Sequence, residues 1–262
     1  MMVRPRLGAV AALCGLVLAG CGETGGAPGG QPGQRRTVVV FAAASLTETF
    51  TALGKSFEGS HPGVRVRFNF GGSSALARQI TQGAPADVFA AASPVTMKVV
   101  TDAGAATGQP RVFVRNRLEI AVPAGNPGKV TALADLADPG LKVVLCAPQV
   151  PCGAAAAGAL AAARVKVTPV SQEQDVKAAL TKVALGEADA ALVYRTDVKA
   201  AGGRVAGIDF PAAARAINDY PIVPLAEAPQ PALAGEFVRL VLSPEGRSEL
   251  TRAGFEVPRA VR

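Results

Sequence analysis

The fold of this chain is decided by residues 38–57, which read VVVFAAASLTETFTALGKSF. The run Val38–Phe41 is β-branched and aromatic and has the length of a buried strand. After it, apolar side chains recur at the spacing of one helical face, at Leu46, Phe50, Leu53 and Phe57. A buried strand that turns directly into an amphipathic helix predicts the strand–helix unit of an α/β protein.

The alternation of short apolar runs and helical stretches continues along the chain. Further strands are expected at 64–70, 87–91, 118–122, 142–145, 190–194 and 220–223. Helices are expected at 74–82, from 94, at 154–163, at 175–185 and, with a break at Ser243-Pro244, at 231–252. This alternation predicts parallel sheets with helices on both faces. Ligands of such proteins bind beyond the carboxyl ends of strands, so the strand-to-helix turns are where a site is expected.

The N-terminus has the features of an export signal followed by a tether. Residues 1–20 combine early arginines, a short apolar run and small residues, which is typical of a secretory signal. The ending Leu18-Ala19-Gly20-Cys21 resembles the bacterial lipobox, which implies cleavage before Cys21 and lipidation of its sulfur. The alternative is an ordinary signal with a chance cysteine. Residues 21–36 are rich in glycine, proline and glutamine and predict a flexible linker. We therefore expect an extracytoplasmic protein, anchored by lipid to the outer face of the membrane or within a periplasm.

The charge of the chain argues against one class of partner. The formal net charge is +7, but the basic residues are scattered and aromatic residues make up only 5% of the chain. Proteins that bind nucleic acid usually carry a basic stripe or stacking aromatic residues. We therefore expect no nucleic-acid partner, and the mild positive field suits an anionic ligand.

Two cysteines remain after the signal and the lipid site, Cys146 and Cys152. Exported proteins fold where disulfides form, so a bridge that closes this short loop is the expected state. A metal-binding pair is the alternative, but it lacks the further cysteine or histidine that a zinc site needs. The chain has one histidine, His61.

Three turns place small or hydrogen-bonding residues at the start of a helix. Ser45 is followed by Glu48 at the spacing of a capping box. The stretches 71–74 and 150–153, GGSS and VPCG, each open a helical region. Capping alone would explain each turn. Several helix N-termini aimed at one point, together with serine hydroxyls, would instead bind an anion without any basic side chain.

Five motifs occur in an order that resembles a known family. They are FAAASLTETF at 41–50, FGGSSALARQITQGAPADVFAAAS at 70–93, VPCG at 150–153, QDVKAAL at 174–180 and ALVYRTDV at 191–198. In this order they resemble the periplasmic molybdate-binding proteins of ABC importers, here in lipoprotein form. The likeness spans nearly all of residues 37–255, and its most specific block is 70–93.

The resemblance implies a two-lobed periplasmic-binding-protein fold, type II-like, in which each lobe is a mainly parallel sheet flanked by helices. The ligand would lie in the cleft between the lobes, which close around it. The first lobe is expected to be discontinuous, residues 37–119 plus 222–262, and the second to span 120–221. Strands near 118–124 and 220–224 would cross between them.

The resemblance also implies the ligand-binding groups. They are the hydroxyls of Ser45, Ser73 and Tyr194 and the backbone amides of Cys152 and Val176. Ser74 is the alternative to Ser73. None of the five positions carries a carboxylate, and a donor-only pocket suits a fully deprotonated dianion. The expected ligand is molybdate or tungstate, with molybdenum present only as the centre of the oxyanion and with no cofactor. Sulfate or another tetrahedral oxyanion is the alternative.

Two other classes of function fit the residues poorly. A serine hydrolase needs a base beside its nucleophile, and the one histidine lies in a turn without a GxSxG motif nearby. A ferric-ion binder would use paired tyrosines and carboxylates, but only Tyr194 and Tyr220 are present. We therefore expect a monomeric binding protein, not an enzyme, whose protein partner is the permease subunit of an ABC importer.

Overall fold

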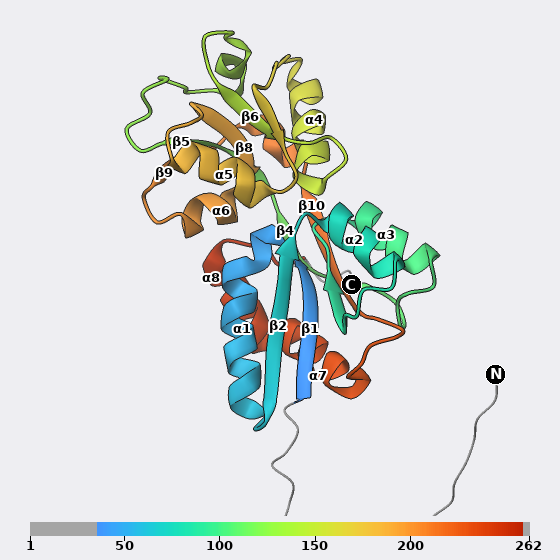
Figure 1. The fold of residues 1–262 in the computed structure, drawn as a ribbon. Coiled ribbons are helices and arrows are strands. Elements are labelled where there is room, and N and C mark those ends of the chain that lie inside the picture. Colours follow the sequence, from blue (N-terminus) through green and yellow to red (C-terminus); the bar gives the residue numbers. More distant parts are fainter. Residues whose placement is uncertain (1–35, 259–262) are drawn as a thin grey trace, which may run out of the picture. The chain divides into compact units, whose positions relative to one another are not determined.

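The computed structural model describes residues 36–258, which contain two five-stranded sheets with helices packed around them (Figure 1). The expected signal, the lipid site and the expected linker up to residue 35 lie outside the described residues, whereas residue 36, also expected in the linker, is the first residue of a strand. Within 36–258, no helix combines the length and the apolar character that crossing a bilayer requires. We call each sheet with its helices a lobe.

The first lobe is built on the sheet with strand order β2-β1-β3-β10-β4. Its strands are β1 (Arg36–Ala43), β2 (Val64–Gly71), β3 (Val88–Ala90), β4 (Arg111–Asn116) and β10 (Asn218–Pro224). Its helices are η1 (Ala44–Leu46), α1 (Thr47–Ser60), α2 (Ser73–Thr81), α3 (Pro94–Asp102), α7 (Pro231–Leu242) and α8 (Pro244–Ala253). The strand and helix predicted from residues 38–57 are confirmed as β1 and α1.

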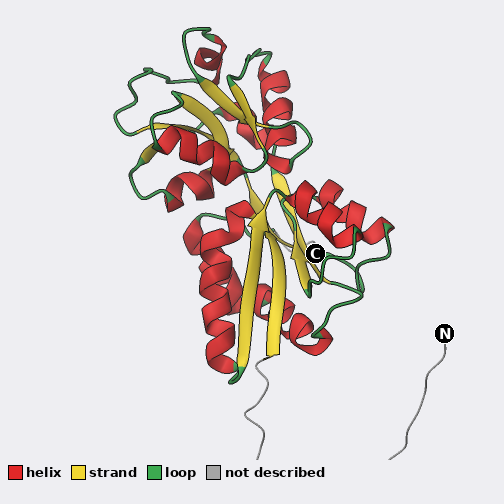
Figure 2. Ribbon diagram, in the orientation of Figure 1, coloured by secondary structure: helices red, strands yellow, loops and turns green. Residues whose placement is uncertain are grey.

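Alternation along β1 explains why helices cover both faces of the first sheet (Figure 2). Val38 and Val40 belong to the apolar cluster that holds α1 and α7, whereas Phe41 belongs to the cluster that holds α2 and α3. The helical face predicted for α1 is fully buried. Its Phe50 lies 5.9 Å, ring centre to ring centre, from Phe237 of α7. Successive side chains of a strand point to opposite faces, so one apolar run serves both layers.

The second lobe is built on the sheet with strand order β7-β6-β8-β5-β9. Its strands are β5 (Leu118–Pro123), β6 (Val143–Cys146), β7 (Ser171–Glu173), β8 (Ala190–Tyr194) and β9 (Val205–Ile208). Its helices are η2 (Leu133–Ala137), α4 (Pro151–Ala163), α5 (Val176–Ala184), α6 (Arg195–Ala200) and η3 (Pro211–Arg215). The expected two-lobed α/β fold is therefore confirmed.

The expectation of mainly parallel sheets is wrong, because both sheets are mixed. Strands β1–β2, β1–β3, β6–β7 and β6–β8 pair in parallel. The pairs β10–β3, β10–β4, β5–β8 and β5–β9 are antiparallel. Every antiparallel pair includes β5 or β10, the strands by which the chain enters each lobe from the other one. The need to cross between lobes sets their direction, which periodicity along the chain does not reveal.

The chain crosses between the sheets where one strand leads almost directly into the next. Only Arg117 separates β4 from β5, and β10 begins at Asn218 in the first sheet. Residues 118–119 therefore lie in the second sheet and residues 218–221 in the first, a few residues from the boundaries expected at 119/120 and 221/222. No loop of several residues marks the first crossing, since β5 begins two residues after β4 ends.

Candidate functional site

A small pocket lies where strand ends of both lobes meet. The empty space among its lining residues is about 230 Å³, part of which is open to solvent. All five sequence-predicted residues line it. The full lining is Ala43, Ala44, Ser45, Gly71, Gly72, Ser73, Ala92, Val150, Pro151, Cys152, Asp175, Val176 and Tyr194. The pocket therefore suits a small ligand, and it has no lysine or arginine among the described lining residues.

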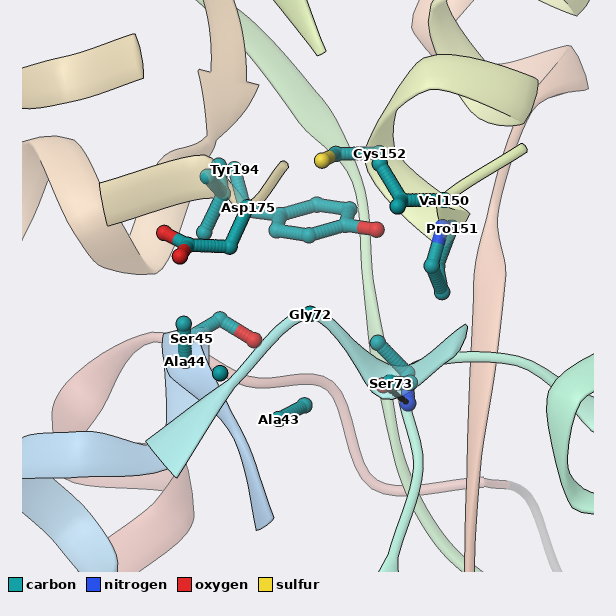
Figure 3. Close-up of a pocket in the computed structure, with 13 residues that line it drawn as sticks. Ala43, Ala44, Ser45, Gly72, Ser73, Val150, Pro151, Cys152, Asp175 and Tyr194 are labelled. Carbon is teal, nitrogen blue, oxygen red and sulfur yellow. Dashed lines mark hydrogen bonds between the residues drawn. The ribbon is translucent and has the colours of Figure 1, made fainter. Parts of the chain in front are cut away.

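Two serines reach the pocket from the first lobe (Figure 3). Ser45 lies in η1, directly after β1, and Ser73 is the first residue of α2. Both are buried. The Ser73 hydroxyl oxygen accepts a 3.0 Å hydrogen bond from the amide of Ala92, which leaves its own hydrogen free to donate. Ser74 instead donates to the carbonyl oxygen of Gln149, at 2.7 Å.

The capping box predicted for Ser45 is wrong. The residue before α1 is Leu46, and no side chain caps that helix. The Ser45 hydroxyl lies 2.8 Å from the Tyr220 hydroxyl, and Glu48 forms an ion pair with Lys177 of α5 at 2.7 Å. Both side chains of the apparent box therefore take tertiary partners, which sequence spacing cannot reveal.

The second lobe contributes two helix starts. Cys152 lies in the first turn of α4, and a disulfide joins it to Cys146 at the end of β6. Val176 is the first residue of α5. The first amides of a helix have no acceptor within it and carry a partial positive charge. Because α2 also begins at the pocket, three helix N-termini face the same small space.

Tyr194 supplies the most specific feature of the pocket. It ends β8, its side chain is 1% exposed, and its hydroxyl has no hydrogen-bond partner among the described residues. Burial raises its pKa well above the ordinary value, as do the nearby Tyr220 and Asp197, so the hydroxyl keeps its proton. A buried polar group without a partner is unfavourable by about 1–3 kcal/mol. Its position in the lining of a pocket indicates that a ligand completes it.

Sequence reasoning missed one polar residue of the lining, Asp175. Its carboxylate accepts a hydrogen bond of 3.0 Å from the Ala178 amide and so caps α5. In Figure 3 the carboxylate is turned away from the Tyr194 hydroxyl. The expectation that the pocket has only donors is therefore incomplete, although it holds for the five predicted positions. The aspartate directly before a helical stretch was the available sequence signal.

The two lobes touch around the pocket. Besides the Ser74–Gln149 hydrogen bond, Glu48 of α1 pairs with Lys177 of α5. Gly72 lies so close to the backbone of Gln174 that a Cβ there would overlap the Gln174 carbonyl oxygen. The lobes are in direct contact on the sides formed by α1 and by the turn before α2.

A charge cluster that contains one buried carboxylate, that of Asp197, lies beside the pocket. The Lys177 ammonium group lies 3.2 Å from Oδ1 of the fully buried Asp197, without hydrogen-bond geometry, and 2.7 Å from Glu48. Burial raises the pKa of the Asp197 carboxyl from 3.8 to about 6, although Lys177 opposes the shift. Burial alone would lower the pKa of Lys177, but attraction to Asp197 and the hydrogen bond with Glu48 raise it.

We expect stability to depend on pH through Asp197. Below about pH 3 its carboxyl is protonated in the folded and the unfolded chain, and there its contribution to stability is greatest. As pH rises toward 6 and above, ionisation favours the unfolded chain, because the folded-state pKa is about 6. The difference between a pKa of 3.8 and one of about 6 corresponds to roughly 3 kcal/mol. Relative to Asp197→Asn, the wild-type free energy of unfolding should fall by about this amount between pH 3 and 7.

Urea unfolding at several pH values measures this difference. The exposed pair of Lys98 and Asp102 offers a matched control, because Asp102→Asn changes the same atoms at the surface. A difference between wild type and Asp197→Asn that stays constant across this range would contradict the expectation.

The described residues hold no group of three or more histidine, cysteine, aspartate or glutamate side chains that could ligate a metal ion. What the pocket does offer is hydroxyl and amide donors at helix starts. Donors of this kind recognise the oxygen atoms of a small anion.

Comparison with known proteins shows which family the chain resembles in sequence and fold. A family described as bacterial extracellular solute-binding protein matches residues 38–256. The molybdate-binding protein ModA of Mycobacterium tuberculosis (strain ATCC 25618 / H37Rv) is 45% identical over 246 residues, which is 94% of each chain. The periplasmic molybdate-binding protein of Azotobacter vinelandii has a similar fold, with a TM-score of 0.73 and 23% identity, over 85% of this chain and all of that one. The sulfate-binding protein SubI from M. tuberculosis H37Rv also has a TM-score of 0.73, with 19% identity, over 86% of this chain and 88% of that one.

Proposed function

Because this chain belongs to the bacterial extracellular solute-binding proteins, we propose that it captures molybdate, and tungstate with it, for delivery to the permease of an ABC importer. It acts as a binding protein, not as an enzyme. The relative that is 45% identical over 94% of the chain is named for molybdate, which supports this ligand. The observation that carries the proposal is the buried Tyr194 hydroxyl, which has no partner among the described residues and lines a pocket of hydroxyls and helix N-termini.

Five groups bind the anion in this proposal. The hydroxyls of Ser45, Ser73 and Tyr194 donate from three elements, and the amides of Cys152 and Val176 donate from the starts of α4 and α5. Their common place in one pocket lining supports the assignment. Ser73 is preferred over Ser74, because the Ser74 hydroxyl is already bonded to Gln149.

The charge of the ligand follows from the donors. The five groups offer hydrogens and no acceptor, so an anion without a proton satisfies all of them. Hydrogen phosphate would need an acceptor for its proton. Among the described lining residues, Asp175 is the one that carries a carboxylate. Phosphate is therefore a necessary competitor in any test. Sulfate is the other one, because a rigid pocket distinguishes it from molybdate by size alone.

The cellular setting is part of the proposal. Residues 1–20 act as a signal that is removed, and Cys21 carries the lipid that tethers residues 21–36 to the membrane surface. The protein works as a monomer. Mass spectrometry of the membrane-bound form tests the anchor, since a chain that begins at a diacylated Cys21 is expected and an unmodified Cys21 would contradict it.

Calorimetric titration of the purified protein with molybdate, tungstate, sulfate and phosphate tests the ligand. Binding of molybdate and tungstate, with sulfate and phosphate much weaker, is expected. Heat with sulfate and none with molybdate would overturn the choice of ligand.

Removal of single donors should weaken binding without unfolding the protein. Tyr194→Phe deletes the hydroxyl that has no partner, and Val176→Pro deletes one amide at a first helical position, which proline tolerates. Asp175 before it has extended backbone angles, as a residue preceding proline requires. Hydrogen bonds to charged groups contribute about 1.5–3 kcal/mol. We expect titration to show a loss of roughly 10- to 150-fold in molybdate affinity for each variant.

Stability of the ligand-free protein distinguishes a binding group from a structural one. Tyr194→Phe removes a buried polar atom without a partner, so its free energy of unfolding should stay level or rise. Ser74→Ala is the control, because Ser74 neighbours the site without lining it, and its affinity should fall less than that of Ser73→Ala. Unchanged affinity in Tyr194→Phe and Val176→Pro would contradict the assigned site.

A further inference from the structure

The Ser45 hydroxyl has a buried partner behind it. Its oxygen lies 2.8 Å from the hydroxyl of Tyr220, and neither side chain is more than 4% exposed. Tyr220 lies on β10, one of the crossing strands, and does not line the pocket. Distance alone leaves open which of the two hydroxyls donates.

Asn116, the last residue of β4, decides the direction. Its side-chain oxygen accepts a hydrogen bond of 3.1 Å from the amide of Arg117, which fixes the orientation of the side-chain amide. Its nitrogen therefore faces the other way and donates to Thr196 at 2.8 Å and, over a longer 3.5 Å, to the Tyr220 hydroxyl. The Tyr220 oxygen accepts from Asn116, and the Ser45 oxygen at 2.8 Å is the acceptor within reach of the Tyr220 hydrogen. Both hydroxyl groups and Asn116 are therefore satisfied together when Tyr220 donates to Ser45.

A hydroxyl group has one hydrogen and can accept through its oxygen. Because Tyr220 donates to the Ser45 oxygen, the hydrogen of Ser45 is left to point into the pocket. Ser73 is arranged in the same way, with the Ala92 amide donating to its oxygen. Each serine therefore presents a hydrogen to the ligand and has a donor behind it. In Ser73 that donor is backbone, whereas in Ser45 it is a side chain that can be replaced.

We infer that Tyr220, oriented by Asn116, is a positioning residue that holds Ser45 as a hydrogen-bond donor and so makes the pocket select oxyanions without a proton. The inference rests on the proposed function, since it concerns the same anion site. A proton on a bound oxyanion would meet another hydrogen at Ser45 and find no acceptor there. Burial raises the pKa of Tyr220, so its hydroxyl keeps the hydrogen that the arrangement needs.

Tyr220→Phe tests the inference. The ring packs edge-on against Phe113, Tyr194 and Phe255, and phenylalanine keeps those contacts. Without the hydroxyl, Ser45 is free to turn and accept a hydrogen bond. Titration at neutral pH should then show molybdate binding about tenfold weaker and phosphate binding unchanged or tighter, so the ratio of the two affinities falls at least tenfold. Equal weakening of both ligands, or no change, would overturn the inference.

Two further variants separate positioning from packing. In a Ser45→Ala background, Tyr220→Phe should have almost no further effect on molybdate affinity, because Tyr220 acts through Ser45. Additive losses would indicate a structural role for Tyr220. Asn116→Ala removes the donor that orients Tyr220 and should lower the same affinity ratio. It serves as the test should Tyr220→Phe fail to fold, and an unchanged ratio would again contradict the inference.

Titration of the wild-type protein distinguishes failure of the positioning role from failure of the proposed function. A wild-type protein that binds neither molybdate nor tungstate refutes the proposed function. A wild-type protein that binds molybdate, together with a Tyr220→Phe variant of unchanged selectivity, refutes the positioning role alone.

Discussion

Replacement of Gly72 by alanine is expected to lower molybdate affinity at least about 100-fold while leaving the ligand-free protein as stable as wild type. A Cβ at this position would overlap the carbonyl oxygen of Gln174, which belongs to the other lobe. The lobes would have to separate, and the anion would lose donors of the second lobe, including both of its amides. Two hydrogen bonds to a charged group contribute together at least about 3 kcal/mol, which corresponds to roughly 100-fold.

The backbone at Gly72 explains why folding should not suffer. Its φ of −63° and ψ of 124° are ordinary for any residue, so alanine introduces no strain within the first lobe. Gly59 is the control, because it lies in α1 outside the pocket lining and a Cβ there would meet nothing within 4 Å. Calorimetric titration and thermal unfolding of both variants give the comparison. A Gly72→Ala variant that binds as tightly as wild type would show that lobe contact at this point is not needed for binding.

Gly153→Ala is expected to lower both stability and affinity. A Cβ in this first turn of α4 would overlap the carbonyl oxygen of Ala147 and lie 2.7 Å from that of Cys146. Both oxygens are backbone atoms of the loop that the Cys146–Cys152 disulfide closes, so they have little freedom to move. Alanine favours a helix over glycine by about 0.5–1 kcal/mol, but overpacking costs about 1–3 kcal/mol or more. The clash therefore outweighs the gain, and the displaced turn also moves the Cys152 amide.

Urea unfolding and molybdate titration measure these two effects. Gly158 lies on the exposed side of the same helix, and a Cβ there would meet nothing within 4 Å. Gly158→Ala should therefore be neutral or stabilising by up to about 1 kcal/mol, with unchanged affinity. Equal stability of the Gly153→Ala variant and wild type would contradict the expected strain.

Local patterns predicted the elements of the fold. The strand and helix at 38–57 follow from apolar residues whose spacing matches the period of each element, and that period is a property of the backbone. The five predicted site residues line one pocket because strand ends and helix starts gather at the same edge of a sheet. The mixed sheets and the lobe boundaries could not be found in this way, since strand direction depends on partners far along the chain.

In the candidate site too, some features follow from local sequence and others depend on residues far along the chain. Ser45 and Glu48 have the spacing of a capping box, but neither caps the helix. Ser45 contacts Tyr220 and Glu48 pairs with Lys177 instead. These partners lie 175 and 129 residues away along the chain. The role of Asn116 likewise depends on Thr196 and Tyr220, which come from two other elements.

The sequence by itself determined which segments form strands and helices, and the order of its motifs predicted five residues that line one pocket. Tertiary structure alone decided that Gly72 meets Gln174, that the Tyr194 hydroxyl is buried without a partner, and that Tyr220 stands behind Ser45. The physical reason is range. Backbone periodicity involves residues a few positions apart, so it can be detected in a short stretch of sequence. The partner of a buried hydroxyl instead depends on how elements distant along the chain pack together.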